Sequence, residues 1–572
     1  AAGVGTKAST DAGTAVGAFA EVQGKYGVAI GGGDSASVRT VAKGEKAVAV
    51  GYNANTAAEN AIAIGTAATV AAGTATADSG TVSGQGSVAI GAASAAKGTN
   101  ATALGQKAEA FGQNSLAAGQ DSHATGKSSV ALGDGAKGSK DSATAVGVYA
   151  NAAGPGATAL GASTQADQWG STAVGLGAQA INNSSATAVG HEAKASAINA
   201  LASGAKAKAT GKNSVATGFN ALASNDGAVA VGSNTQATNA STAMGDSSKA
   251  TGLNSTALGW QANAAGRADV YIGKQAGFGT SNSGNFDNVG IGEGAARNAG
   301  SASQAVTNVV AIGTGAAEGI QESHNIAIGA YANGTGSGNA QVTTGNNIAI
   351  GQRAYAKGGN SIALGQRTTA EGSAALAFGV SASAGGANSL AVGQLAEASG
   401  AGSVAIGGSA QTANTARARG TQAIAIGQKS NATGDQATAM GVNAQASGNA
   451  AVAVGKDNNV SGNGSGALGS GNTVGQANSF VLGKDVTTSQ ANSVVLGNAS
   501  TDRAATAETQ ATVNGITYSG FAGVGSAANG VVSVGKSGGE RQLINVAAGN
   551  ISATSTDAIN GSQLYLTQQA LG

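Results

Sequence analysis

The sequence predicts an all-β fold, a parallel β-roll solenoid of fourteen-residue coils, from a fixed spacing and an alternation of side chains. Short similar segments such as Ala101–Gly105, Val130–Gly133 and Thr158–Gly161 recur, and the glycines that end them fall fourteen residues apart over much of the chain. A short fixed period is the signature of a solenoid, which buries its core only by stacking neighbouring repeats. Side chains alternate with period two, as in strands. Each coil should therefore hold two strands of about five residues, with a glycine at each turn, where positive φ is tolerated.

The composition fits thin layers of small side chains and excludes several classes of protein. Of 572 residues, 96 are glycine, and only 3% are aromatic although 41% are hydrophobic. A net charge of +1 gives no electrostatic footprint for nucleic acid. The absence of cysteine excludes a disulfide framework, and no apolar run approaches the ~18 residues of a membrane-spanning helix. We expect any membrane anchor or export signal to lie outside this sequence.

Three parts follow one another along the chain. Residues 1–500 carry the repeat, with irregular inserts around 274–346 where the spacing of the closing glycines widens. Inserts of this kind map to loops, often on a binding face. Residues 501–539 form a β-rich connector in which Val513–Tyr518 and Val531–Gly535 are typical of strands. Residues 540–572 end in a pattern typical of a helix, for which Thr556 or Asp557 is a plausible N-cap.

The alternation also indicates which face of each coil is inside. In the second strand of one unit, Ala108 and Ala110 share a face, and Lys107 and Glu109 share the other. The charged pair cannot enter a narrow interior, so the alanines should fill it in both strands. The large residues of the first strand then point outward and form an apolar ridge on the order of 140 Å long. The alternative arrangement, with large residues inside and alanines outside, stays open at this point.

Such a ridge predicts an obligate homo-oligomer, because each buried aliphatic side chain contributes about 1.5–3 kcal/mol. The residues expected in this interface, which the resemblance below makes a trimer interface, are Val88, Ile90, Leu104, Leu132, Leu160, Ile362, Leu364, Val404 and Ile406.

A ligand-binding patch is expected on the polar side of the second strands. Arg353 and Tyr355 follow Gly351 at the two polar positions, and Arg367 takes the same place one coil later. Stacked coils would set the two arginines about 4.8 Å apart beside an exposed tyrosine. Arginine and tyrosine are frequent binding hot spots. The alternative is ordinary solvated decoration, since lone surface charges contribute little.

The sequence shows no sign of an enzyme, a metal site or a cofactor. His123, His191 and His324 fall in separate repeats, with no carboxylate or second histidine at ligand spacing. Gly290–Ala295 imitates part of a dinucleotide-binding fingerprint, but it lies within the repeat rhythm and no helix pattern follows it.

Several motifs resemble the trimeric autotransporter adhesins. The units Asn213–Ala216, Asn360–Gly365 and Gly402–Gly407 resemble the YadA-like head repeat, and Arg541–Gly549 with Thr556–Leu564 resembles the neck of that family. The neck residues that carry the resemblance are Arg541, Asn545, Asp557, Asn560, Gln563 and Leu564. The resemblance implies a left-handed roll in each of three identical chains, and a neck that leads into a coiled-coil stalk.

The resemblance also implies a location and a function. It suggests a virulence-associated protein of the bacterial cell surface, anchored in the outer membrane by a part outside this sequence. The expected function is attachment to host extracellular matrix, host-cell receptors, other bacteria or surfaces. The alternative is a passive spacer that projects another binding domain. An ice-binding roll is disfavoured because threonine occurs singly, as at Thr158 and Thr172, and not in flat ranks.

Overall fold

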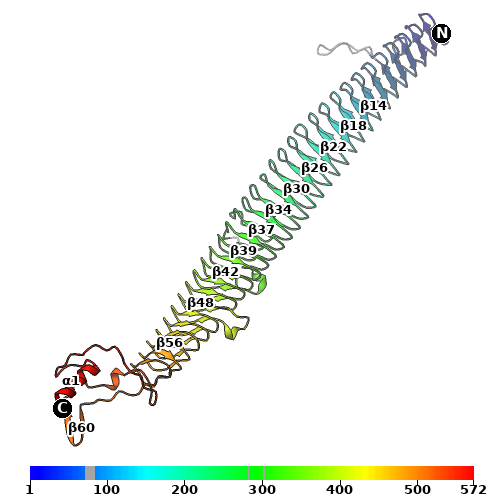
Figure 1. Ribbon diagram of the computed structural model, residues 1–572. Coiled ribbons are helices and arrows are strands. Elements are labelled where there is room, and N and C mark those ends of the chain that lie inside the picture. Colours follow the sequence, from blue (N-terminus) through cyan, green and yellow to red (C-terminus); the bar gives the residue numbers. More distant parts are fainter. Residues whose placement is uncertain (71–83, 281, 301–302, 572) are drawn as a thin grey trace. The chain divides into compact units, whose positions relative to one another are not determined.

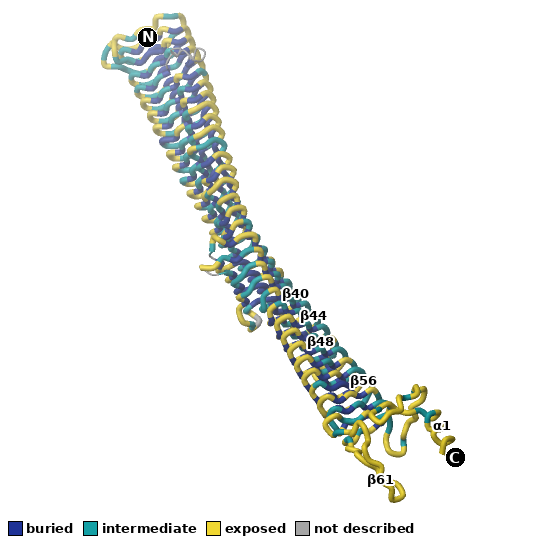
Figure 2. Tube along the Cα trace, turned by 90° about the vertical axis from the view of Figure 1, so that its left-hand side faces the viewer, coloured by how far each residue is buried: buried dark blue, intermediate teal, exposed yellow. Residues whose placement is uncertain are grey.

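The computed structural model describes residues 1–70, 84–280, 282–300 and 303–571. These residues form two compact units, Ala1–Asn288 and Val289–Gly572. Each unit is a stack of short coils with a first and a second parallel sheet on opposite sides (Figure 1). Figure 2 shows the buried residues as a column inside each stack, with exposed residues at the corners. The predicted all-β parallel solenoid is confirmed.

Alanine fills the interior of both units, as the alternation predicted. In one coil, Ala101 and Ala103 from the first side and Ala108 and Ala110 from the second are all completely buried. Most strands have three residues on the first side and two on the second, not five, because the corners take up the rest of the coil; β56 (Gly466–Ser470) and β58 (Phe480–Lys484) do have five. Neighbouring coils stack in register, so most core alanines lie over the alanine one coil away, as Ala103 does over Ala117.

The described residues of unit 1 contain eighteen strands in each sheet. The first-sheet strands are β2 (Thr14–Val16), β4 (Val28–Ile30), β6 (Val48–Val50), β8 (Ile62–Ile64), β10 (Val88–Ile90), β12 (Thr102–Leu104), β14 (Leu116–Ala118), β16 (Val130–Leu132), β18 (Thr144–Val146), β20 (Thr158–Leu160), β22 (Thr172–Val174), β24 (Thr187–Val189), β26 (Leu201–Ser203), β28 (Val215–Thr217), β30 (Val229–Val231), β32 (Thr242–Met244), β34 (Thr256–Leu258) and β36 (Val270–Ile272). The second-sheet strands are β1 (Lys7–Ala8), β3 (Glu21–Val22), β5 (Val41–Ala42), β7 (Asn55–Thr56), β9 (Thr69–Val70), β11 (Ala95–Ala96), β13 (Glu109–Ala110), β15 (His123–Ala124), β17 (Lys137–Gly138), β19 (Asn151–Ala152), β21 (Gln165–Ala166), β23 (Gln179–Ala180), β25 (Lys194–Ala195), β27 (Lys208–Ala209), β29 (Leu222–Ala223), β31 (Gln236–Ala237), β33 (Lys249–Ala250) and β35 (Asn263–Ala264).

Unit 2 repeats this plan, but its first sheet has more strands than its second. Its first-sheet strands are β37 (Val289–Ile291), β38 (Val310–Ile312), β39 (Ile326–Ile328), β40 (Ile348–Ile350), β42 (Ile362–Leu364), β44 (Leu376–Phe378), β46 (Leu390–Val392), β48 (Val404–Ile406), β50 (Ile424–Ile426), β52 (Thr438–Met440), β54 (Val452–Val454), β56 (Gly466–Ser470), β58 (Phe480–Lys484), β59 (Val494–Leu496) and β62 (Val532–Ser533). Its second-sheet strands are β41 (Tyr355–Ala356), β43 (Thr369–Ala370), β45 (Ser383–Ala384), β47 (Glu397–Ala398), β49 (Arg417–Ala418), β51 (Asn431–Ala432), β53 (Gln445–Ala446), β55 (Asn459–Val460) and β57 (Thr473–Val474). Outside the sheets, the part of unit 2 that the structure describes holds the short 3-10 helices η1 (Thr335–Ser337), η2 (Thr412–Asn414) and η3 (Ala527–Asn529).

Each coil turns at a first corner, after the first-sheet strand, and at a second corner, after the second-sheet strand. At the first corner Gly105 has φ of 130°, and a Cβ there would lie 2.6 Å from the carbonyl oxygen of Gly119 in the next coil. Gly112, at the second corner, lacks positive φ; it is glycine because the next coil's backbone would collide with a Cβ. Positive φ falls instead on the non-glycine corner residues, here Lys107 and Asn114. Lys107 thus lies in a corner, not in the second strand where it was predicted.

The irregular inserts predicted around 274–346 coincide with a change in the coil. Among the described residues between β37 and β40, the second side carries turns in place of strands. Larger side chains enter the interior there, and Val306, Val309, Ile320 and Val342 are buried. The wider core explains the longer repeats, since more chain is needed to enclose bulkier residues.

The C-terminal part differs from the prediction in two places. Residues 513–518 do not form one strand: β60 (Gln510–Val513) and β61 (Ile516–Ser519) make an antiparallel hairpin. The reason is the Asn514-Gly515 pair, whose positive φ values suit a tight two-residue turn. The helix α1 (Gly561–Leu571) starts later than predicted, with Asn560 before it in place of Thr556 or Asp557. The Asn560 Oδ1 accepts a hydrogen bond from the backbone N–H of Gln563 at 3.3 Å, as an N-cap does.

Candidate functional site: an aliphatic ridge and a polar face

The outward-facing first and third residues of the first-sheet strands form a surface that we call the aliphatic ridge. In β10 the middle residue, Ala89, is fully buried, whereas Ile90 is 40% exposed. Leu104, directly over Ile90 in the next coil, is 37% exposed. Large residues therefore point outward, and the alternative with large residues inside is wrong.

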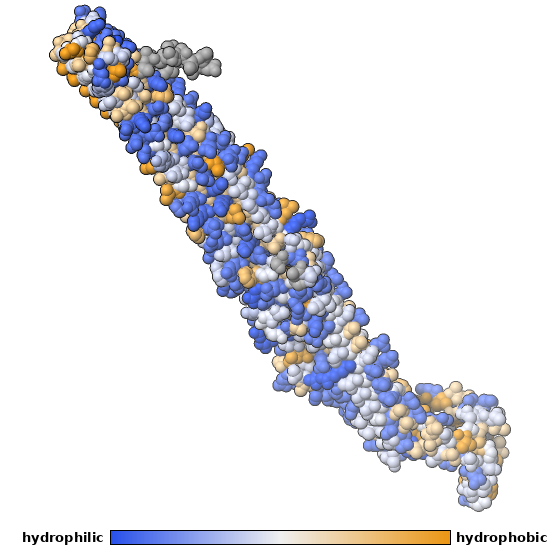
Figure 3. All heavy atoms as spheres, turned by 180° about the vertical axis from the view of Figure 1, so that it is seen from behind, coloured by the Kyte–Doolittle hydropathy of each residue, from blue (hydrophilic) through white to orange (hydrophobic). Residues whose placement is uncertain are grey.

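All nine residues predicted for the trimer interface lie on this ridge, and none of them is buried in the single chain. They are Val88, Ile90, Leu104, Leu132 and Leu160 in unit 1, and Ile362, Leu364, Val404 and Ile406 in unit 2. The ridge is not uniformly aliphatic, because threonine takes the first outward position in strands such as β18 and β20. Figure 3 shows apolar side chains interspersed with polar ones on the face that it presents.

The predicted ligand patch is only partly present on the second side of unit 2. Arg353 and Arg367 are exposed and stack in adjacent coils, where the backbone N–H of Arg367 donates to the Gln352 carbonyl at 2.9 Å. Both arginines lie at first corners with φ of 56° and 55°, not in strands as predicted.

The prediction that Tyr355 is exposed is wrong. Tyr355 is only 5% exposed, because its hydroxyl reaches into the preceding insert and donates to the Ala340 carbonyl at 3.0 Å. Burial raises the pKa of the Tyr355 phenol, and the Glu371 carboxylate raises it further. The insert covers the ring, so Tyr355 contributes packing to the roll. Whether Arg353 and Arg367 bind a ligand stays a prediction.

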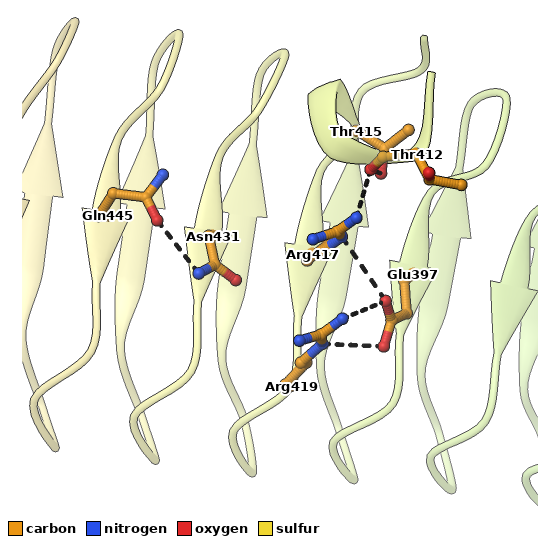
Figure 4. A network of polar contacts seen from close by, with 7 residues as sticks. All are labelled: Glu397, Thr412, Thr415, Arg417, Arg419, Asn431 and Gln445. Atoms are coloured by element: carbon orange, nitrogen blue, oxygen red, sulfur yellow. Dashed lines mark hydrogen bonds and ion pairs between the residues drawn. The ribbon is translucent and has the colours of Figure 1, made fainter. Parts of the chain in front are cut away.

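A charged cluster that sequence reasoning missed lies further along the same face (Figure 4). Arg419 donates to both carboxylate oxygens of Glu397, at 2.9 and 2.8 Å, and the Arg417 Nε lies 3.8 Å from the same carboxylate. The hydrogen bond from Arg419 holds the pKa of Glu397 below its usual value. Arg417 also donates to the Thr412 carbonyl, so the cluster ties the insert that contains η2 to the second sheet.

A signal for this cluster was present in the sequence. Arg417 in β49 and Arg419 directly after that strand occupy two outward positions, and Glu397 occupies the position matching Arg417 in the preceding coil, displaced by the insert between them. A register that allowed for the insert would have aligned the three charges.

Two of the three histidines have a carboxylate neighbour, contrary to prediction. The Nε2 of His123 lies 3.3 Å from the Glu109 carboxylate, because the two residues stack in adjacent coils. His191 lies 3.8 Å from the neighbouring Glu192. In the described part of the chain, no three His, Cys, Asp or Glu side chains are grouped so that they could hold a metal ion.

Four of the six predicted neck residues form side-chain hydrogen bonds, and these four divide into two sets. Arg541 caps the last coil of the roll, donating to the Ser500 hydroxyl at 2.8 Å and to the Asn498 carbonyl at 2.7 Å. The other set gathers where the extended segment before α1 turns into the helix.

In that second set, side chains bridge the two arms of a bend. The Gln563 amide accepts from the Gly549 N–H at 3.0 Å and donates to its carbonyl at 2.6 Å. Asn560 donates to the Val546 carbonyl at 3.1 Å, and Asp557 accepts from the Asn550 N–H at 3.0 Å. Two residues lie outside this bonding: Asn545 has φ of 62° and Leu564 is 50% exposed.

Two family models match this chain. The family model for the YadA head domain repeat matches thirteen overlapping or separate segments between 42 and 458, which together cover about half of the chain. The family model for the coiled stalk of trimeric autotransporter adhesins matches 542–572. The chain belongs to the trimeric autotransporter adhesins. The head matches leave out 263–347, which contains the irregular coils.

Two individual proteins are similar to parts of this adhesin. The autotransporter adhesin BtaE of Brucella suis biovar 1 (strain 1330) is 57% identical over 60 residues, which are 10% of this chain and 8% of BtaE. The solved C-terminal YadA-like domain of a Burkholderia pseudomallei protein is 43% identical and covers 20% of this chain and 49% of that one, with a TM-score of 0.16. Within the described residues, no helix has the length and apolar character needed to cross a membrane.

Proposed function

We propose that this chain is the adhesive head of a surface-displayed homotrimer, in which the aliphatic ridges of three rolls pack around a common axis. The observation that carries the proposal is the division of each coil into two faces. The first sheet turns aliphatic residues outward, and the second turns outward a varied set of polar ones. A ridge of this length in water would strongly favour association.

The second-sheet face is then the surface left for a ligand. On that face the cluster of Glu397, Arg417 and Arg419 is partly exposed, with the η2 insert standing beside it, and Arg353 and Arg367 lie nearer the start of unit 2. Three copies on one rigid head raise the effective concentration of every weak contact. The ligand class that fits is an extended macromolecule, an extracellular matrix protein or a cell-surface receptor.

The location and the domain boundaries belong to the same proposal. Membership of the family implies display at the bacterial surface and anchoring in the outer membrane. We assign 1–500 to the head, 501–539 to a connector and 540–572 to the neck and the start of the stalk. The pairing of Val532 in β62 with Val494 in β59 extends the first sheet into the connector, which supports a direct transition from roll to neck.

Attachment of the immobilised chain to matrix proteins and to host cells tests the adhesive role. The double variant Arg417→Ala/Arg419→Ala should lose attachment while sedimenting as the parent does. The matched control Asn431→Ala/Gln445→Ala alters the same face one and two coils away, where the losses are an amide pair at 3.1 Å and the bond from Gln445 to the Lys429 carbonyl at 3.1 Å. Equal attachment by both variants and the parent would place the binding surface elsewhere. A chain that attaches to nothing tested would favour the passive spacer.

A further inference from the structure

Unit 1 carries large apolar side chains at its corners as well as on the ridge. Trp169 is 64% exposed and stands at a second corner, between β21 and β22. Leu176, at the next first corner, is 54% exposed, and Val148, two coils before it at a first corner, is 45% exposed. In a single chain these apolar side chains stay exposed, because the first-sheet strands separate the first corners from the second corners. They lie at both edges of the aliphatic ridge.

A threefold arrangement brings opposite corners together. When three first sheets face a common axis, the edge of each sheet meets the opposite edge of the next, because a cyclic assembly repeats one heterologous contact. The second corner of one subunit therefore meets the first corner of its neighbour. The two kinds of corner alternate every seven residues along the chain. A second-corner residue thus lies half a coil, about 2.4 Å, above and below the neighbour's residues seven places before and after it.

For Trp169 this rule selects Ala162 and Leu176. Ala162 is a small residue at the first corner between those of Val148 and Leu176. The larger side chains of Val148 and Leu176 therefore leave a notch over Ala162. The corner residues beside the notch, Ser163 and Gly177, are also small. We propose that Trp169 of each subunit inserts into the notch between the partner subunit's Ala162 and the partner subunit's Leu176, and so fixes the axial register of the trimer. This inference rests on the proposed packing of the ridges.

Other corner residues of unit 1 obey the same seven-residue rule. Pro155, at the second corner one coil before Trp169, is matched to Val148 and Ala162. Leu253, 48% exposed, is matched to Trp260, 42% exposed, so a second apolar contact forms. The rule also pairs opposite charges, because Lys127 at a second corner is matched to Asp134 at a first corner. Matched apolar and charged pairs along one edge favour one register over its neighbours.

Disulfide cross-linking tests the contact in the full chain, which has no cysteine of its own. The variant Trp169→Cys/Leu176→Cys should form covalent trimers on mild oxidation, seen on a non-reducing gel. Within one chain the two positions lie on the order of 15 Å apart across β22, well beyond the ~7 Å that a disulfide spans. The matched control is Trp169→Cys/Ala205→Cys. Its first-corner cysteine lies two and a half coils, about 12 Å, along the stack from the level of residue 169. This control should stay uncross-linked, as should each single-cysteine variant.

Sedimentation of the reduced variants separates the two proposals. A chain that sediments as a trimer but does not cross-link through 169 and 176, or that cross-links equally through 169 and 205, overturns the register while leaving the ridge interface standing. A chain that sediments as a monomer overturns both. As a second readout, Trp260→Phe leaves Trp169 as the sole tryptophan. Its emission should shift to the red when Leu104, Leu132 and Leu160 are all replaced by Asp, and an unchanged emission in a variant that has become monomeric would contradict the contact.

Discussion

Asp269 offers the sharpest test of the energetics of the roll, because it places a carboxyl group inside the core of unit 1. It occupies the position before the first-sheet strand, where other coils commonly carry a buried serine or alanine, and it is completely buried. Its Oδ1 accepts hydrogen bonds from the Asn288 N–H at 3.1 Å and from the Asn288 side chain at 3.0 Å. Its Oδ2 accepts from the Gly266 N–H at 3.1 Å. Burial outweighs these bonds and raises the pKa of Asp269 from 3.8 to about 6, with a further contribution from the exposed Asp287 carboxylate.

The raised pKa fixes the sign of the pH dependence. The folded chain binds the proton of Asp269 more tightly than the unfolded chain does, so stability falls as the pH rises from about 4 to about 6. Below that window both states are protonated and no penalty applies. Above it the full penalty remains, about 3 kcal/mol for a shift of about two pH units at 1.36 kcal/mol each.

Asp269→Asn should remove this penalty. Asparagine is compatible with the position, because Asn325 and Asn347 stand at the same place in unit 2 and donate to carbonyls three residues earlier. The substitution loses the bond from the Gly266 N–H, which costs about 1 kcal/mol. We therefore expect the variant to be about 2 kcal/mol more stable locally at pH 7.5 and slightly less stable at pH 4.

Native-state hydrogen exchange measures the effect where it acts, since a solenoid opens locally. The amides to follow are Thr256, which donates to the Asp269 carbonyl at 2.8 Å, and Val270, which donates to the Asn288 carbonyl at 2.8 Å. Their opening free energies, corrected for intrinsic exchange, should fall between pH 4 and pH 7 in the parent and stay level in Asp269→Asn. The exposed Asp287→Asn variant should keep most of the slope. A flat parent profile, or an Asp269→Asn variant that keeps the slope, would refute the reasoning.

Three further perturbations test the roll, the ridge and the neck. Gly105→Ala should open its coil, because a Cβ there is strained at φ of 130° and lies 2.6 Å from the Gly119 carbonyl oxygen; exchange should rise near residue 105 and not at distant coils. Replacing Leu104, Leu132 and Leu160 together by Asp should yield monomers, since each buried carboxylate costs several kcal/mol; an equally heat-stable trimer in sedimentation would show that the ridge is not the interface. Removing 540–572 should weaken the trimer but keep the β-signal in circular dichroism, and loss of that signal would contradict the independence of the roll from the neck.

The fold was predictable because its rule is local and repeated. The alternation around Ala108 and Ala110 excluded charged residues from a narrow interior, and the same constraint applied to every coil. Two details of the coil were not predictable from alternation. The corners, at residues such as Lys107 and Asn114, take residues away from the strands, because αL geometry is set by backbone hydrogen bonding between coils. Gly112 is glycine because the backbone of the next coil approaches it closely. A glycine in the sequence does not by itself show whether close approach or positive φ requires it.

The candidate site was less predictable because it depends on where the rule is broken. Tyr355 was expected to be exposed from its place in the repeat, but the insert before it folds back and supplies the Ala340 carbonyl. Glu397 and Arg419 are distant in a fourteen-residue register and become partners only because the η2 insert lengthens one coil. An insert changes both the register and the surface, and the repeat pattern carries no information on the direction in which it folds.

The same contrast explains how a monotonous array can carry a specific assembly. Alanine recurs at most levels of the core, so over most of the roll the interior gives one coil little preference for another. Ridge residues are mostly similar aliphatic and threonine side chains, so over most of the ridge a shift of one coil between subunits would cost little. Corner residues are free of the core, and there Trp169, Leu176, Leu253 and Trp260 differ strongly from their neighbours in the stack. We therefore infer that the corners, where the seven-residue matches occur, carry most of the register information that the roll itself supplies.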